Sequence, residues 1–307
     1  MTGTAQPPGQ LAGRRRRAAA LLVILAVAGV AGCGQPGGRH GTGSAATDVL
    51  LPEHILNAPK NLLAAALPRD AGSMWVLAGP PSAGLFRFSL AAGRARGSVS
   101  VSGAARSVAQ SRAGEIGLAV GTRRSGALEL LRGTKPRLVR TVALPAPARQ
   151  VVAGRGARFY VLTARPGSAS VTIVSGRSGA VSGSVPVPED AVSVAVTPSG
   201  RQPDIYVLER TGLVDVIAAV TGKITASFRA GTAGRALAIS PDGDTLYVLK
   251  GTAAVSNVAV VSVATESVRR VLPAPSHCHG LLVSADGGQL YEVVGTRSYG
   301  NIQVFAV

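Results

Sequence analysis

The segment RALAISPDGDTLYVL, residues 235–249, decides the fold. A short apolar run ends at Ser240, the tripeptide Pro241-Asp242-Gly243 follows, and a second apolar run begins after it. Proline fixes φ at the second position of a turn, aspartate bonds back to the backbone and glycine accepts a positive φ, so the tripeptide predicts a tight turn. Two further apolar runs, 258–263 and 267–272, complete the unit. The pattern therefore predicts four short antiparallel strands.

The second apolar run of this unit recurs along the chain. The copies are Met74–Leu77, Ile116–Ala119, Phe159–Leu162, Ile205–Leu208, Leu246–Leu249 and Leu290–Val293. Measured at the second residue of each copy, the intervals are 42, 43, 46, 41 and 44 residues. A period in this range is typical of stacked or radially arranged repeats, and strand-like units favour a β-propeller over a helical solenoid. We predict an all-β, six-bladed propeller of four-stranded antiparallel blades over residues 48–307.

The sixth unit is incomplete, because the sequence ends at Val307, at the end of its third strand. A propeller removes an open edge by closing its ring with a strand from the opposite terminus. We therefore expect an N-terminal strand, Asp48-Val49-Leu50-Leu51, to pair beside 302–307 and complete the sixth blade. The alternative is that residues 48–60 form only a loop or a short helix over one face.

The first 33 residues have the features of an export signal. Arg14 to Arg17 form a positively charged region, an apolar stretch runs from Ala18 to Val30, and Cys33 follows. The apolar stretch is shorter than the roughly 20 residues that a spanning helix needs. Residues 34–47 are rich in Gly, Ser, Thr and Ala, which predicts a flexible tether.

Val30-Ala31-Gly32-Cys33 resembles a bacterial lipobox, whose pattern is an aliphatic residue, two small residues and a cysteine. The resemblance implies a lipoprotein signal peptide over 1–33, with cleavage before Cys33 and diacylation of its thiol. Two acyl chains give durable anchoring. We expect a monomer held at the extracytoplasmic face of the cell membrane. An ordinary secretory signal with an incidental cysteine is the alternative, and the export route, general secretory or twin-arginine, stays open.

The unit over residues 235–272 resembles the YVTN-type, WD40-like, β-propeller repeat. The resemblance is carried by Leu237–Gly243, by Leu246-Tyr247-Val248 and by Val263-Ala264-Thr265, and it is good in the last three repeats. The Ala-Asn that usually follows Tyr-Val is replaced here by Leu249-Lys250. Proteins with such repeats include envelope proteins, lactonase relatives and quinoprotein dehydrogenases, so the resemblance specifies a fold better than a function.

Innermost strands line a propeller's channel, so the starts of these strands locate a channel mouth. Counting back eight residues from each turn glycine gives Ala64, Arg106, Ala148, Val192, Arg235 and His279, and the neighbouring position adds Arg149. We predict an anion site formed by Arg106, Arg149, Arg235 and His279, because converging cations focus the field and donate charge-assisted hydrogen bonds. The alternative is that these are solvated side chains in an arginine-rich protein with the register one residue off.

Evidence for catalysis is thin. His277 and His279 are weak metal candidates, since positions two apart share a face of a strand, but a stable site needs a third ligand. The other histidines are His40 and His54, near the tether. No nucleophile elbow, phosphate loop or zinc motif occurs, and the innermost-strand segments hold no carboxylate before the turn. We expect no catalytic residue and no cofactor.

The formal net charge of +17 constrains the partner. Nucleic acid is not expected, because the signal predicts export and aromatic residues are only 4% of the chain. Anionic phospholipid headgroups or cell-wall polymers fit a tethered basic domain better. The sequence therefore favours a binding or scaffolding module for an anionic ligand or an envelope partner. A lactonase-like hydrolase or a quinone- or metal-dependent dehydrogenase is the alternative.

Overall fold

The computed structural model describes residues 51–68, 72–81, 83–198 and 203–307. These residues form 24 strands and contain no helix, and all belong to one compact unit, Thr47–Val307. No described segment forms a helix long and apolar enough to cross a membrane. The signal peptide with Cys33, the tether and His40 lie outside the described residues.

The strands form six sheets of four, each running outward from an innermost strand. Blade 1 contains β2 (Leu62–Ala66), β3 (Ser73–Ala78), β4 (Gly84–Ser89) and β5 (Arg94–Val99). Blade 2 contains β6 (Ala105–Gln110), β7 (Ile116–Gly121), β8 (Gly126–Arg132) and β9 (Arg137–Leu144). Blade 3 contains β10 (Ala148–Ala153), β11 (Arg158–Arg165), β12 (Ser168–Ser175) and β13 (Val181–Val187).

The second half of the ring repeats this order. Blade 4 contains β14 (Ala191–Val196), β15 (Asp204–Glu209), β16 (Leu213–Ala218) and β17 (Lys223–Arg229). Blade 5 contains β18 (Gly234–Ile239), β19 (Thr245–Gly251), β20 (Ser256–Ser262) and β21 (Ser267–Ala274). Blade 6 contains β22 (Cys278–Val283), β23 (Gln289–Gly295), β24 (Gly300–Ala306) and β1 (His54–Ala58).

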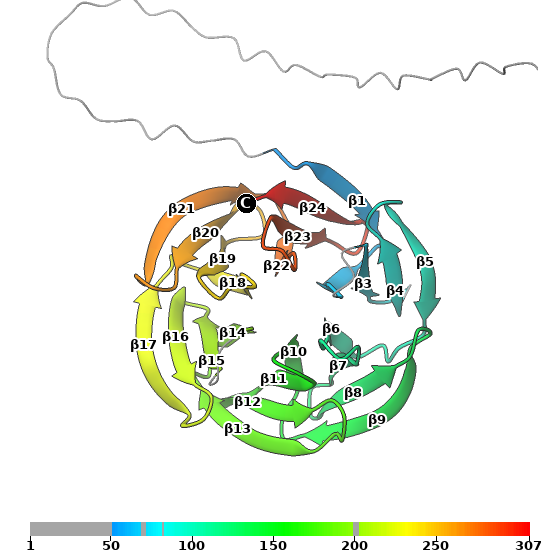
Figure 1. Ribbon diagram of the computed structural model, residues 1–307, viewed down its shortest axis with the longest axis horizontal. Coiled ribbons are helices and arrows are strands. Elements are labelled where there is room, and N and C mark those ends of the chain that lie inside the picture. Colours follow the sequence, from blue (N-terminus) through cyan, green and yellow to red (C-terminus); the bar gives the residue numbers. More distant parts are fainter. Residues whose placement is uncertain (1–50, 69–71, 82, 199–202) are drawn as a thin grey trace, which may run out of the picture. The chain divides into compact units, whose positions relative to one another are not determined.

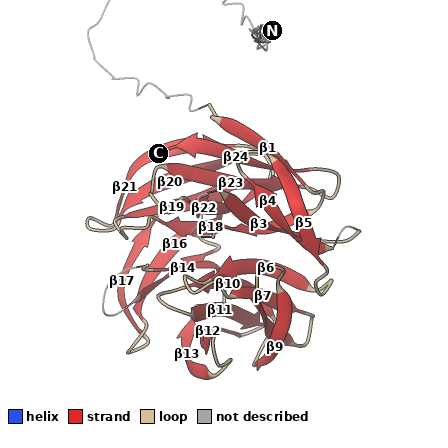
Figure 2. Ribbon diagram, turned by 45° about the vertical axis from the view of Figure 1, so that its right-hand side comes forward, coloured by secondary structure: helices blue, strands red, loops and turns tan. Residues whose placement is uncertain are grey.

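The blades are arranged in a ring around a central axis, with β6, β10, β14, β18 and β22 innermost (Figure 1). Every pairing within a blade is antiparallel, and the described part of the chain is drawn entirely as strands and loops (Figure 2). The predicted all-β, six-bladed architecture is therefore confirmed.

An N-terminal strand completes the sixth blade. β1 pairs with β24 from His54 opposite Val304 to Ala58 opposite Gly300, and the Glu53 amide donates a further bond to the Val304 carbonyl at 2.7 Å. Chain segments from the two ends thus share one sheet. Closure by an N-terminal strand is confirmed.

The position predicted for this strand was wrong. The closing strand begins at His54, whereas Leu51 lies outside it and is 76% exposed; Asp48 to Leu50 lie outside the described residues. The expectation followed the most apolar run, but outermost strands bury little, and five of the six residues of β5 are exposed. In β1 only Leu56 is buried. A segment of mixed polar and apolar residues can therefore form an outermost strand.

The recurring apolar quartet packs neighbouring blades together. In β23, Tyr291 and Val293 lie in a cluster with residues of blade 1, whereas Leu290 and Val294 lie in a cluster with residues of blade 5. Successive side chains of a strand point to opposite faces, so a second strand buried on both faces is apolar at every position. The feature that revealed the repeat is thus the core between blades.

The predicted turn chemistry is present. In blade 5 the Gly243 amide donates to the Ser240 carbonyl at 3.0 Å, Gly243 has a φ of 89°, and the Ser240 hydroxyl donates to the Asp242 carboxylate. Blade 6 repeats these bonds with Ser284, Asp286 and Gly287. The turn ties the innermost strand to the second strand and fixes their relative register.

Leu56 provides a test of ring closure. Its side chain is 8% exposed and packs with Ile302 and Val304, so Leu56→Ala should lower the free energy of unfolding by about 2 to 3 kcal/mol in a denaturant titration. The matched control is Ile55→Ala, one residue away and 56% exposed, which should cost about 0.5 kcal/mol or less. Equal effects of the two variants would contradict the proposed role of β1.

Candidate functional site

The candidate site lies at the channel mouth, where every innermost strand carries a β-bulge. The pairing of each innermost strand with its second strand skips one residue. The skipped residues are Leu63, Arg106, Arg149, Val192, Arg235 and His279. A bulge bends the strand and re-aims a side chain. All six residues line one cavity of about 410 Å³ on the propeller axis.

The structure therefore brings together the four residues predicted for the anion site, Arg106, Arg149, Arg235 and His279, on the lining of this cavity. The predicted register was one residue off in two repeats. Leu63 and Arg149, rather than Ala64 and Ala148, occupy the bulge, and Ala148 is buried in the core at 1% exposure. Sequence spacing alone does not locate a bulge, because the extra residue shifts the pairing register by one position and leaves no distinctive residue type in the sequence.

Backbone carbonyls hold two of the arginines. Arg106 Nε donates to the Gly121 carbonyl at 3.2 Å, and Arg235 Nη1 donates to the Thr252 carbonyl at 2.8 Å. The described residues that line the cavity include no carboxylate. A carbonyl oxygen accepts a hydrogen bond without cancelling the positive charge, so the mouth remains cationic. Arg106 and Arg149 are exposed, whereas Arg235 and His279 are partly buried.

The His279 ring reaches inward at the junction between blades 6 and 1. Its Nδ1 lies 3.2 Å from the His277 carbonyl, and its Nε2 is buried with no hydrogen-bond partner. Burial lowers the pKa of His279 and the charge of Arg235 adds to this effect, although the nearby carbonyls of His277, Leu63 and Leu62 oppose it. The structure thus favours a neutral imidazole in the free protein.

The two metal candidates do not share a face of a strand. His277 precedes β22 with a φ of 61°, and its ring meets the edge of Tyr299 at a centroid distance of 6.3 Å. His279 instead lines the cavity. Among the described residues no three His, Cys, Asp or Glu side chains form a group that could hold a metal ion, and His54 is exposed in β1.

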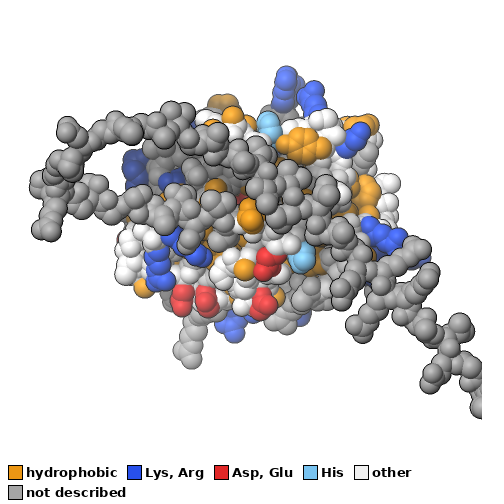
Figure 3. Space-filling view, turned by 90° about the horizontal axis from the view of Figure 1, so that it is seen from above, with side chains coloured by type: hydrophobic (Ala, Val, Ile, Leu, Met, Phe, Trp, Pro, Cys, Tyr) orange, Lys and Arg blue, Asp and Glu red, His pale blue; other side chains and the backbone are white. Residues whose placement is uncertain are grey.

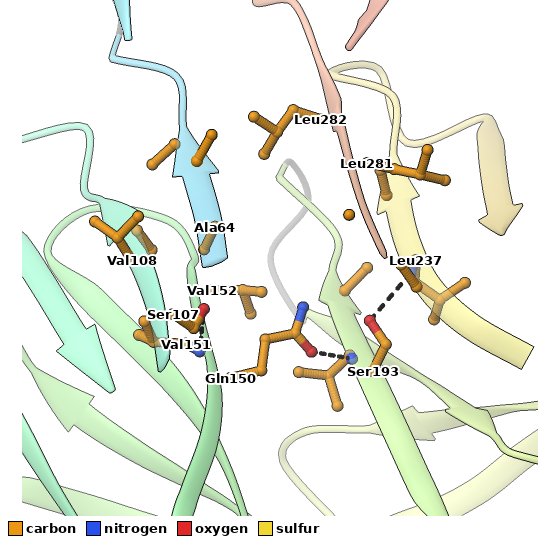
Figure 4. A pocket seen from close by; sticks show the side chains of 18 of the residues that line it. Ala64, Ser107, Val108, Gln150, Val151, Val152, Ser193, Leu237, Leu281 and Leu282 are labelled. Carbon is orange, nitrogen blue, oxygen red and sulfur yellow. Dashed lines mark hydrogen bonds between the residues drawn. The ribbon is translucent and has the colours of Figure 1, made fainter. Parts of the chain in front are cut away.

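Polar residues inside the channel were missed by the sequence analysis. The Val151 amide donates to Ser107 Oγ at 3.2 Å, the Val194 amide to Gln150 Oε1 at 2.7 Å, and the Leu237 amide to Ser193 Oγ at 3.0 Å (Figure 4). Each acceptor follows a bulge residue and bonds to the next blade. A signal existed in the sequence, since Ser, Gln and Ser stand at one repeated position within otherwise apolar strands.

Glu292 is a buried carboxyl group away from the channel lining. It lies in β23, where the other blades carry Val or Leu, and it is 1% exposed with Oε2 unpartnered. Burial raises the pKa of Glu292 to about 8. Burial and, to a lesser extent, the charge of Glu292 raise the pKa of the Cys278 thiol to about 12, so this thiol is not an activated nucleophile.

Glu292 should make stability fall as pH rises. The folded protein holds the proton up to about pH 8, whereas the unfolded chain releases it near the ordinary value of 4.5. The stabilisation is complete below pH 4.5 and is lost as pH rises through 8. Glu292→Val should therefore gain stability over the wild type as pH rises from 5 to 8, by about 1.4 kcal/mol per pH unit.

The measurement is a series of denaturant titrations across this pH range. The control, Glu189→Gln, changes an exposed carboxyl group and should follow the wild-type curve. Parallel curves for the wild type and Glu292→Val would show that Glu292 is not buried as described.

Basic side chains outside the channel occur in several separate groups on the visible part of the side that carries β24. Apolar, acidic and neutral side chains lie between these groups (Figure 3). At the mouth, by contrast, the bulges direct three arginines and one histidine to one cavity. The mouth is therefore the stronger candidate for binding a compact anion.

Comparisons with known proteins identify the fold and no more. No family model matches the sequence, and no curated protein is similar to it in sequence. The structure matches 1550 chains of known structure. One of them, from Kuenenia stuttgartiensis hydrazine synthase, has a TM-score of 0.62 and 14% identity, over 80% of this chain and 83% of that chain. A likeness at this identity shows a shared propeller fold.

Proposed function

We propose that this protein is a membrane-anchored extracytoplasmic lipoprotein whose propeller binds an anionic ligand at the channel mouth. The observation that carries the proposal is the convergence of Arg106, Arg149, Arg235 and His279 on a cavity whose described lining has no carboxylate. The bulges direct these side chains to one cavity, so a ligand there would meet donors from several blades.

Electrostatics favours an anion there over a cation or a neutral ligand. Cations that surround a concave site with low-dielectric walls focus the field, which raises the local concentration of anions. Guanidinium groups also donate charge-assisted hydrogen bonds, which are about twice as strong as bonds between neutral groups. Because carbonyls rather than carboxylates hold Arg106 and Arg235, this charge is available to a ligand.

The N-terminal sequence supports the proposed location. A lipidated Cys33 would hold the propeller close to a membrane through residues 34–47, and anionic headgroups or cell-wall polymers would surround it. Membership of the YVTN-type repeat family, which includes envelope proteins, belongs to the same proposal and rests on the Ser-Pro-Asp-Gly and Tyr-Val elements of the later repeats.

Removing two mouth charges tests anion binding. The double variant Arg106→Ala, Arg235→Ala should bind polyphosphate about tenfold more weakly than the wild type, because two charge-assisted contacts are lost. Fluorescence anisotropy with labelled polyphosphate measures the change in the full chain.

A control must separate the mouth from net charge. Arg94→Ala, Arg96→Ala removes the same charge from the exposed strand β5, and it should leave the affinity within about twofold of the wild type. If both double variants weaken binding equally, the interaction is with overall charge and the mouth is not the site.

Cys33→Ala tests the anchor. Without a thiol to acylate, the variant should appear in the soluble extracytoplasmic fraction, whereas the wild type should partition into the detergent phase and incorporate labelled palmitate. A variant that stays in the membrane fraction would refute lipid anchoring at Cys33.

A further inference from the structure

The six junctions between neighbouring innermost strands are of two kinds. At each junction, the residue that follows the bulge of one blade faces a backbone amide of the next blade. The residues in this position are Ala64, Ser107, Gln150, Ser193, Ala236 and Gly280, in order from blade 1 to blade 6. Three are polar and accept the facing amide. Ala64, Ala236 and Gly280 carry no side-chain acceptor.

The amides that face these three residues belong to Val108, Leu281 and Ala65. The three amides that bond across a junction all belong to residues at one position of the strand ladder. The pairs across the ladder are Val151 with Val161, Val194 with Val207 and Leu237 with Val248. Val108, Leu281 and Ala65 lie at the same ladder position, opposite Leu118, Glu292 and Val76. In an antiparallel ladder this position directs its amide away from the partner strand. All three amides therefore point toward the channel.

No side chain of the described residues is seen to accept a hydrogen bond from these amides. Val108, Leu281 and Ala65 are 4%, 6% and 6% exposed. A buried amide without an acceptor costs free energy, so such groups bind a ligand or an ordered water.

The three amides are adjacent and surround His279. They lie at the junctions 5–6, 6–1 and 1–2, and the His279 ring, with its unpartnered Nε2, is at the central junction beside Leu62 and Leu63. The basic bulge residues belong to blades 5, 6, 2 and 3, on both sides of the same arc, whereas blade 4, across the ring, carries Val192. Of the four predicted mouth residues, Arg235, His279 and Arg106 thus belong to blades on the half of the channel that holds the three amides. Arg149 of blade 3 lies outside this half, and blade 1, at its centre, carries Leu63.

The lining also includes apolar side chains, namely Leu67, Val152, Ile239, Leu282 and Val283. A ligand of about 410 Å³ with an apolar body and an anionic group could contact both these side chains and the cationic residues. A monoanion suits this setting better than a phosphate dianion, since moving charge into an apolar cavity costs more as the charge rises.

We propose that the arc formed by the Leu281, Ala65 and Val108 amides binds the carboxylate of a small organic acid whose apolar body lies along the channel. This inference rests on the proposed anion-binding function and names its ligand class. A carboxylate has two oxygens with about four lone-pair sites, so it can accept several amides at once. The arginines at the mouth then shield the carboxylate from solvent and stabilise its charge.

The test supplies the missing acceptors from the protein itself. In Ala64→Ser, Ala236→Ser the new hydroxyls should accept the Val108 and Leu281 amides, as Ser107 and Ser193 accept theirs. Benzoate is the probe and benzamide, its neutral analogue, is the matched ligand. By calorimetry on the full chain, the double variant should bind benzoate at least about tenfold more weakly than the wild type, because two donors are lost.

The control Ala153→Ser adds a hydroxyl to the channel lining in blade 3, where Gln150 already serves the junction. It should bind benzoate like the wild type. Weaker binding by the Ala64→Ser, Ala236→Ser variant alone, with preference for benzoate over benzamide, supports the inference.

Other outcomes overturn it and separate it from the proposed function. If Arg106→Ala, Arg235→Ala weakens benzoate binding but the serine variant binds normally, the mouth binds anions and the amides do not. If the wild type does not prefer benzoate to benzamide, the ligand class is wrong, whereas polyphosphate binding still decides the proposed function. Equal losses in the serine variant and Ala153→Ser would show that added polarity alone perturbs the channel.

Discussion

A single extra residue near the start of each innermost strand determines what the channel presents. Six strands must approach one axis while remaining paired with their own blades, and the bulge supplies the necessary bend. The same bend directs the bulge residue to the mouth, as with Arg106 and His279, and brings the following residue to an amide of the next blade. The mouth and the junctions are therefore consequences of one backbone irregularity.

On this repeated backbone, small changes in sequence make the ring asymmetric. Ser107, Gln150 and Ser193 satisfy amides across three consecutive junctions, and so they add bonds between blades on one half of the ring. Ala236, Gly280 and Ala64 offer no side-chain acceptor at the other three junctions. A fold whose blades are nearly equivalent thus acquires a polar side that can orient a ligand. The binding properties of the channel depend on the residues that depart from the repeat.

Most of the architecture could be predicted from the sequence, because blade packing makes Tyr247, Val248 and their counterparts apolar at a fixed period, and because Ser-Pro-Asp-Gly has local turn chemistry. The sequence also predicted that blade 6 lacks its own outer strand, because the sixth repeat contains only three apolar runs. The closing strand was misplaced, since an outermost strand such as β1 buries only Leu56 and leaves little pattern. The convergence of the mouth residues was predicted, but the bulge at Arg149 and the bonds between blades depend on register, which spacing does not reveal.

The most direct test of the central claim follows the six junction amides by NMR. In the labelled full chain, benzoate should move the amide protons of Ala65, Val108 and Leu281 downfield, because each gains a carboxylate acceptor. Val151, Val194 and Leu237 should move little, since Ser107, Gln150 and Ser193 already accept their amides. Equal shifts at all six amides, or larger shifts at the three that are already paired, would contradict the account.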